Sequence, residues 1–284
     1  MKNFKKIILI LTVFPLWGTG GLKLFSQTHR FFYEMQMKLG DQTEKMNMVL
    51  DIDKDFVKFY DYDFIMYDSI SKKNGSLTQT NTISDQLILR KRNTFENKSF
   101  HDNEFDYFVI ESEDEMNWKL EPEIKTVEEY RLQKATTNFG GRHWTAWFCN
   151  DIPFQEGPYK FRGLPGLIFE LNDDKNDFVY SLIKSINLPK TFDTSHFLET
   201  HYGNQPISVT LKQYHKVKLD YYNDPYTKTK SELKELLENG GSLTIGGEKI
   251  IRPEQLDQKR KQMQQWIKED YNPIESDKAI PYPD

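Results

Sequence analysis

Short apolar and aromatic segments alternate with turn residues from Thr28 to about Ile186. Segments rich in β-branched and aromatic residues, spaced about 8 to 12 residues apart, are typical of strands in a meandering antiparallel sheet. The expected strands cover residues 30–39, 46–52, 56–60, 63–71, 86–91, 94–101, 106–111, 116–120, 129–136, 142–149, 167–171 and 178–186.

The last third of the chain changes to helical periodicity. Apolar residues at three- and four-residue spacing predict helices over residues 208–222, 231–239 and 253–268. Pairs of glycines flank residues 242–245 and predict a short hairpin there. Residues 272–284 contain three prolines and are expected to be extended or loose.

These patterns predict an α+β fold that is mainly β. We expect a strongly curved, half-barrel-like antiparallel sheet over residues 28–186, with two or three C-terminal helices packed on it from the helical region 208–269. The strand 142–149 carries Trp144 and Phe148 on one face and Trp147 and Cys149 on the other. We therefore expect both faces of this strand to be covered.

The N-terminus has the layout of a secretory signal peptide. A basic head with Lys2, Lys5 and Lys6 precedes an apolar run over residues 7–17 and a polar exit at Ser26. The run is shorter than the roughly 20 residues that a membrane-spanning helix needs. We predict a signal peptide over residues 1–26, with a cut near Gly20 as the alternative, and a single domain over 27–271. A short membrane anchor or a buried core helix is the other interpretation of this run.

The net charge and the single cysteine exclude several classes of partner and of site. The formal charge is −5, and it becomes −9 without residues 1–26, which hold four lysines and no acidic residue. An acidic chain repels phosphate backbones, so we expect no nucleic-acid partner. Cys149 is the only cysteine, which excludes an intramolecular disulfide and a cysteine-based metal cluster and favours a buried thiol. With the signal peptide removed, we expect no transmembrane span.

The densest motif lies in the middle of the chain. The motif consists of glycines, prolines and apolar residues that interrupt regular structure and then start an apolar strand. They are Gly157, Pro158, Gly163, Leu164, Pro165, Gly166, Leu167 and Ile168. Pro165 followed by Gly166 is turn chemistry, because proline presets φ and glycine accepts positive φ. We interpret these eight residues as a structural motif that launches a core strand.

Residues 163–168 spell the hexapeptide that names the GLPGLI family of Bacteroidetes, and the chain resembles that family. Further blocks in family order are Trp118, residues 135–139, 141–142, 144–148, 151–153, 157–158 and 272–275. Leu132 stands where many relatives carry a cysteine. The resemblance implies an exported protein of unknown function. The order of elements also resembles the half-barrel of periplasmic lipoprotein carriers, in which a curved sheet leaves an apolar concavity.

No motif in the sequence indicates catalysis. The histidines lack the spacing of zinc peptidases, and neither a nucleophile elbow nor a phosphate-binding glycine loop occurs. The acidic run Glu111, Glu113, Asp114 and Glu115 is interpreted as a solvated turn. Residues 172–177 resemble a calcium loop but lack its glycine and its final acidic residue, which favours a hairpin turn. We predict no metal, no cofactor and no catalytic residue.

Arginine and aromatic side chains supply the candidates for binding. Arg142, His143, Trp144, Trp147 and Arg162 interleave charge with large rings, as binding hot spots do. The alternative is that the aromatic residues belong to the core and the charges stand on the outer face.

The function predicted from these observations is binding rather than bond-making, in the periplasm or outside the cell. The partner would be an apolar or peptide-like ligand, or an outer-membrane protein. An aromatic-lined cavity of roughly several hundred Å³ would support this prediction, and a concavity filled by the protein's own side chains would count against it. A secreted hydrolase with an unrecognised site and a surface-acting assembly factor are the alternatives.

Overall fold

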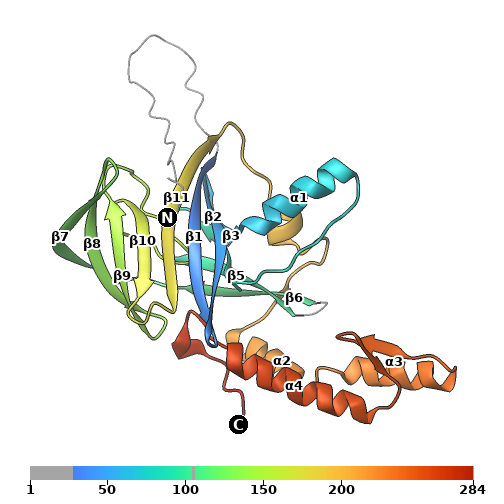
Figure 1. The fold of residues 1–284 in the computed structure, drawn as a ribbon. Coiled ribbons are helices and arrows are strands. Elements are labelled where there is room, and N and C mark those ends of the chain that lie inside the picture. Colours follow the sequence, from blue (N-terminus) through green and yellow to red (C-terminus); the bar gives the residue numbers. More distant parts are fainter. Residues whose placement is uncertain (1–27, 104–105, 284) are drawn as a thin grey trace, which may run out of the picture.

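The protein is built around one 12-stranded sheet in the computed structural model, which describes residues 28–103 and 106–283. The sheet has the order β12-β6-β5-β4-β3-β2-β1-β11-β10-β9-β8-β7 and is not closed (Figure 1). Its strands are β1 (Thr28–Leu39), β2 (Gln42–Asp53), β3 (Phe56–Asp61), β4 (Leu87–Lys91), β5 (Glu96–Asn103), β6 (Asp106–Glu113), β7 (Lys119–Val127), β8 (Tyr130–Phe139), β9 (Arg142–Cys149), β10 (Leu167–Asp173), β11 (Phe178–Leu188) and β12 (Ile207–Ser208).

Helices occur in one insertion and in the C-terminal third. They are α1 (Tyr62–Asn74), α2 (Leu211–Asn223), α3 (Thr227–Glu238) and α4 (Glu254–Asp270), with a π-helical turn at Ser195–Glu199 and a 3-10 turn at Ser276–Lys278. A separate hairpin joins β13 (Leu243–Ile245) to β14 (Glu248–Ile250), with Gly246 and Gly247 at its turn. The predicted helices and this hairpin are therefore confirmed, and the fold is mostly β as expected.

Strand β1 joins the two parts of the sheet. It pairs over its whole length with β2 on one side and over most of it with β11 on the other, both antiparallel. This pairing brings the N-terminal strands β2–β6 beside the later strands β7–β11, so one continuous sheet takes strands from the chain between Thr28 and Ser208. The predicted signal peptide, residues 1–26, lies outside the described residues.

One face of the sheet, here called the inner face, carries the main core. Along β1 the alternate residues Phe31, Tyr33 and Met35 are buried on this face, as period-two patterning requires. They pack in one cluster with Trp144 on β9 and Phe161 from the segment before β10. Because these residues come from both parts of the sheet, the core holds the curved sheet together.

The outer face of the N-terminal strands carries a second core, and α1 covers it. Val49 and Tyr60 on the outer face of β2 and β3 pack with Phe64 of α1 and Phe197 of the π-helical turn. The Phe64 and Phe197 rings are stacked at 5.3 Å between centroids. Figure 1 shows α1 lying beside β2 and β3 on this face.

The prediction of a strand over 63–71 is wrong, because these residues form α1. The segment has no clear apolar stripe, and its aromatic and β-branched residues imitate a strand. The helix instead buries Phe64 and Asp68, which are one helical turn apart, and ends where Gly75 adopts φ +66°. Packing against the outer face thus overrides local preference.

Both edges of the sheet differ from the prediction. The expected strand 116–120 is in fact β7, which starts at Lys119 and runs to Val127. It is an exposed edge strand, and Pro122 lies where its pairing with β8 is irregular. Its side chains therefore do not alternate between buried and exposed. At the other edge, β12 pairs with β6 in parallel, so the sheet is mixed rather than wholly antiparallel.

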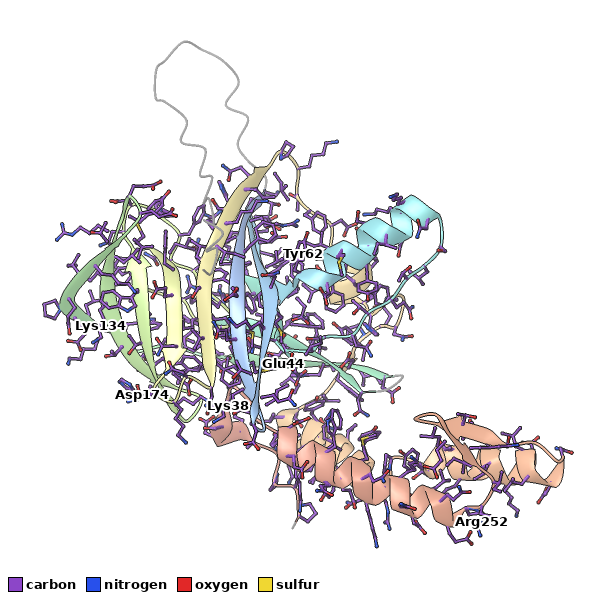
Figure 2. The ribbon with its side chains drawn as sticks, viewed as in Figure 1. Lys38, Glu44, Tyr62, Lys134, Asp174 and Arg252 are labelled. Carbon is purple, nitrogen blue, oxygen red and sulfur yellow. The ribbon has the colours of Figure 1, made fainter. Side chains whose placement is uncertain are left out.

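The C-terminal helices do not all pack on the sheet. Helix α2 and the C-terminal end of α4 lie along the end of the sheet, whereas α3, the hairpin and the N-terminal end of α4 extend away from it as an arm (Figure 1). The arm has its own small core of Leu233, Ile250 and Leu256. Figure 2 shows Arg252 on this arm and Lys38 where the end of β1 meets the C-terminal region. Within the described residues, no helix has the length and apolar content to cross a membrane.

The tail was predicted over residues 272–284 to be extended or loose, and over residues 272–283 it is held in place by contacts with the rest of the chain. Ile274, Glu275 and Ile280 are each 8 % exposed. The Asn272 side chain donates to the Lys38 carbonyl at 2.7 Å, and the backbone N–H of Ile280 donates to the Tyr271 hydroxyl at 2.6 Å. Side-chain contacts therefore replace the regular hydrogen bonds that this proline-containing segment lacks.

Candidate functional site

The inner face of the sheet is filled over most strands but opens over β5 and β6. Ile88 on β4 belongs to the main core, and its neighbours across the sheet on the same face are Ser99 and then Ile110. Beyond Ser99 the core stops, and a cleft of about 960 Å³ lies between this part of the sheet and the C-terminal elements. That volume matches the upper end of small-ligand sites.

The cleft is lined by both aromatic and polar side chains. Its aromatic residues come mainly from the C-terminal elements and are Tyr159, Phe178, Tyr214, Tyr221, Trp266, Tyr271 and Tyr282. Its charged and imidazole side chains are Asp85, His101, Asp102, Glu111, Lys160, His215, Lys218, Asp270, Glu275 and Lys278. Such a lining offers apolar contact area together with donors and acceptors at fixed places.

A buried charged cluster of Lys160, Asp114, Glu275 and Lys278 forms one wall. The Lys160 ammonium lies 3.0 Å from the Asp114 carboxylate and 2.7 Å from the Glu275 carboxylate. Lys278 reaches Asp114 at 3.1 Å and also contacts Glu275, and the Tyr159 hydroxyl donates to Glu275 at 2.6 Å. The cluster joins the tail to the sheet and to the segment before β10.

The charges in this cluster stabilise one another. Burial raises the pKa of Asp114, but the Lys160 ammonium, the Ser112 hydroxyl and the Lys278 ammonium outweigh it and hold that pKa at about 2. Burial and the same two lysines act in the same way on Glu275, whose pKa is lowered. The interpretation of Asp114 as part of a solvated acidic turn is therefore wrong, although Glu111 and Glu113 are exposed.

The cleft lining also holds an imidazole and two carboxylates. His101 Nδ1 lies 2.8 Å from the Asp85 carboxylate, and the His101 ring packs on Tyr214 at 4.6 Å between centroids. Burial and the nearby Asp85 charge raise the pKa of Asp102. The buried Ser99 hydroxyl has no hydrogen-bond partner among the described residues, so it is not paired with His101 as a hydrolase nucleophile would be.

Arg142 belongs to the structural frame beside the cleft. Its guanidinium contacts the Asp173 and Asp177 carboxylates, each at 2.9 Å, and donates to the Asn272 side chain at 2.6 Å and to the carbonyls of Pro273 and Ile274. All the donors of this residue therefore point to the protein itself. The carboxylate of Asp173 also accepts from the Phe178 N–H at 2.9 Å. In the turn that resembles a calcium loop, this carboxylate is therefore bonded to groups of the protein itself.

The other candidates do not converge on one surface. Trp144 is fully buried, and its ring lies 4.6 Å from the Phe161 ring. Trp147 points to the opposite face, where it is only partly buried beneath the Lys125 ammonium at 4.3 Å. The expectation that both faces of β9 are fully covered is thus wrong for the middle of the strand, although Cys149 at its end is buried as predicted.

His143 and Arg162 occupy two further environments. His143 is 43 % exposed and lies 2.9 Å from the Asp174 carboxylate in the neighbouring turn. Arg162 is buried, stacks on Phe95 at 4.6 Å and lies 3.4 Å from Glu156, which also pairs with the buried Arg90. Neither residue lines the cleft.

The glycine- and proline-rich motif forms a tight loop that fills the core before β10. The Gly166 N–H donates to the Leu164 carbonyl at 2.8 Å, and β10 starts at the next residue, so the predicted turn is present, but Gly166 does not adopt the positive φ that the prediction gave it. A Cβ on Gly166 would lie 2.0 Å from the Cys149 carbonyl oxygen, and one on Gly157 would lie 2.6 Å from the Ile168 side chain. These two positions require glycine because the backbone approaches other atoms closely.

Sequence reasoning missed most of the cleft. Lys160 lies inside the motif and Glu275 in the tail block, so two of the cleft's buried charges were in segments already singled out. The sequence did hold a signal for these two residues. Each is a charged residue in a turn-rich block, and a charged residue among turns and large aromatic residues can indicate a buried ion pair. His101, Asp85 and Asp102 gave no such signal, because nothing in the sequence shows that the hairpin β5–β6 faces the tail.

Comparisons with known proteins add a short family match. The model of a family described as "Protein of unknown function (Porph_ging)" matches residues 140–170, which include β9 and the motif loop. No curated protein matches the chain.

Two solved structures, both of PNGF-II, share 15 % and 14 % identity with the chain at a TM-score of 0.48. Each comparison covers 67 % of this chain and 32 % of the other, so the chain spans about a third of those structures.

Proposed function

We propose that this chain is an exported cell-envelope protein that binds a peptide-like ligand, or a segment of an outer-membrane partner, in the cleft. The observation that carries the proposal is the cleft of about 960 Å³ on the inner face over β5 and β6. Its tyrosines and charged groups suit a ligand that presents both apolar and hydrogen-bonding surface.

The lining favours a peptide-like ligand over a purely apolar one. An apolar ligand would bring no hydrogen-bond partner to the largely buried Asp102 carboxylate in the cleft lining, which is costly in a desolvated site. The rest of the inner face is filled by the protein's own side chains, among them Trp144 and Phe161. That filling counts against a lipid-like ligand deep in the concavity.

Export and family membership belong to this proposal. The basic and apolar pattern of residues 1–26 supports export, and the hexapeptide at 163–168 supports a place in the GLPGLI family. The half-barrel likeness is supported by the open 12-stranded sheet, whereas the filling of its inner face over most strands counts against it. N-terminal sequencing of the protein from an envelope fraction tests export: a start near Gly21 or Gln27 is expected, and an intact Met1 in the cytosol contradicts it.

Selection from a random decapeptide library against the mature protein tests peptide binding. Trp266 lines the cleft and is 59 % exposed, so Trp266→Ala removes contact area at little cost in stability. We expect this variant to weaken the tightest selected peptide about tenfold. Ile251→Ala is the matched control, because Ile251 is 50 % exposed on the arm outside the cleft. Failure to select any peptide, or equal loss in both variants, contradicts the proposal.

A further inference from the structure

One edge of the sheet opens into the cleft with unpaired backbone groups. Strand β6 pairs with β5 along its whole length, but β12 covers its other side only at Phe108 and Val109. After β12 the chain turns away into α2, which begins at Leu211. The rest of β6 includes Ile110, Glu111 and Ser112, and all three line the cleft.

Two hydrogen bonds fix which backbone groups of β6 point outward. The Asp114 N–H donates to the Phe95 carbonyl at 3.1 Å, and this pair continues the β5–β6 register. Since groups alternate in an antiparallel ladder, Ser112 also faces β5, and Glu111 and Glu113 face the outer side. The Val209 N–H donates to the Val109 carbonyl at 3.0 Å, which confirms that odd-numbered residues of β6 face that side.

The outward groups of Glu111 and Glu113 have no backbone partner among the described residues. Continuation of the β12 pattern would bond the Glu111 N–H to the Val209 carbonyl, and that bond is not formed. Two N–H groups and two carbonyls therefore remain at the spacing of a strand edge. The short strand β12 shows that this edge accepts an extended segment.

The two edges of the sheet are not equivalent. Strand β7 carries Pro122 and an irregularity in its pairing, both of which hinder the addition of another strand. The open part of β6 has no proline and keeps a regular register with β5 from Asp106 to Glu113. Only the β6 edge, among these two, also adjoins a cleft that has room for side chains.

We infer that the ligand of the cleft is an extended polypeptide segment that pairs with the free edge of β6 at Glu111 and Glu113. It would lie in line with β12, along the same edge of the sheet. This inference rests on the proposed function and specifies its binding mode. The ligand backbone supplies hydrogen bonds that are independent of sequence, and alternate side chains enter the cleft. The cleft that receives these side chains is lined by Tyr214 and Trp266, among others.

The tightest peptide from the decapeptide selection is the probe. Glu111→Pro removes the outward N–H, and proline is tolerated at an edge position, whereas Glu111→Ala keeps the N–H and serves as the matched control. We expect Glu111→Pro to weaken binding at least tenfold and Glu111→Ala less than threefold. Circular dichroism and thermal melting check that both variants fold.

Peptides with a single N-methylated amide test the same inference on the unmodified protein. Methylation removes one donor at a time, so strand pairing predicts losses that alternate along the peptide with a period of two. Losses without this period overturn the inference, as does unchanged binding to a folded Glu111→Pro variant. If Trp266→Ala still weakens peptide binding in that case, the proposed function stands and only the inferred strand pairing fails. If no peptide is selected, the proposed function and the strand pairing both fail.

Discussion

The inner face of one sheet behaves differently at its two ends. Over β9 and β10 it presents large apolar side chains such as Trp144 and Phe148, and the motif loop inserts Phe161 against them. Over β5 and β6 the same face presents Ser99 and Ser112 beside Ile110, and the motif loop reaches it with Lys160, which donates to the Ser112 hydroxyl at 3.2 Å. One end therefore supplies stability, and the other keeps a cleft.

The covering elements differ in the same way. The motif loop enters the core and is tied to strands on both sides, for example by the Leu167 N–H that donates to the Ile152 carbonyl at 3.1 Å. Helices α2 and α4 and the tail instead span the open end at its margin and leave space beneath them. The comparison teaches that side-chain size on alternate strand positions decides whether the inner face of the sheet is filled or leaves a cleft.

Truncation of a large side chain at each end is the strongest test of this comparison. Phe161 is fully buried between Trp144 and Phe139, so Phe161→Ala should lower the free energy of unfolding by about 3–5 kcal/mol. Ile110 is half-buried and faces the cleft, so Ile110→Ala should cost about 1 kcal/mol. Urea unfolding followed by tryptophan fluorescence measures both. Equal losses would show that the open end is packed like the rest.

Arg142 tests the boundary between the two ends, because it binds β10, the following turn and the tail together. Arg142→Ala leaves the carboxylate of Asp173, which is 2 % exposed, without its cation, and should destabilise the protein by about 3 kcal/mol. The variant should also release the tail, seen as faster proteolysis after residue 271. Arg252→Ala on the arm is the matched control and should change neither measurement. A stable Arg142→Ala variant that loses only ligand binding would return Arg142 to the binding residues.

Much of the sheet could be predicted from sequence because alternation encodes it directly. Strand β9 was predicted at its observed bounds, since Trp144, Ala146 and Phe148 alternate along the buried face. The turn at Pro165 and Gly166 was equally readable. Helix α1 was not, because Tyr62–Asn74 gains its stability from docking on a face that the sequence cannot identify.

The candidate site was harder to predict than the fold. Arg142 and Arg162 combine charge with neighbouring aromatic residues, which is the pattern of a binding surface and also of a buried ion pair, and local sequence does not distinguish the two. The cleft depends on contacts between distant segments, such as Lys160 with Glu275. Only the relative position of those segments in the fold reveals it.

Acid should loosen the wall of the open end before it unfolds the filled end. The pKa of Asp114 is about 2 in the folded protein, against roughly 3.9 in an unfolded chain, and that of Glu275 is also lowered. A lowered folded-state pKa gives stability that is present above the unfolded value and is lost as the pH falls toward the folded value. For Asp114 the loss runs from about pH 4 down to about pH 2.

Hydrogen exchange of the tail measures this effect. Exchange of residues 272–283 should rise between pH 4 and pH 2 beyond the intrinsic pH dependence, while amides of β1 and β9 stay protected. Asp114→Asn removes the titrating carboxylate and should flatten the change, at the cost of a looser tail at neutral pH. Because the cluster has partial solvent access through Lys278, which is 36 % exposed, we expect this to be the smallest of the effects. If the tail and β9 lose protection together, the two ends form one cooperative unit, and the division between a packed end and a binding end has no counterpart in stability.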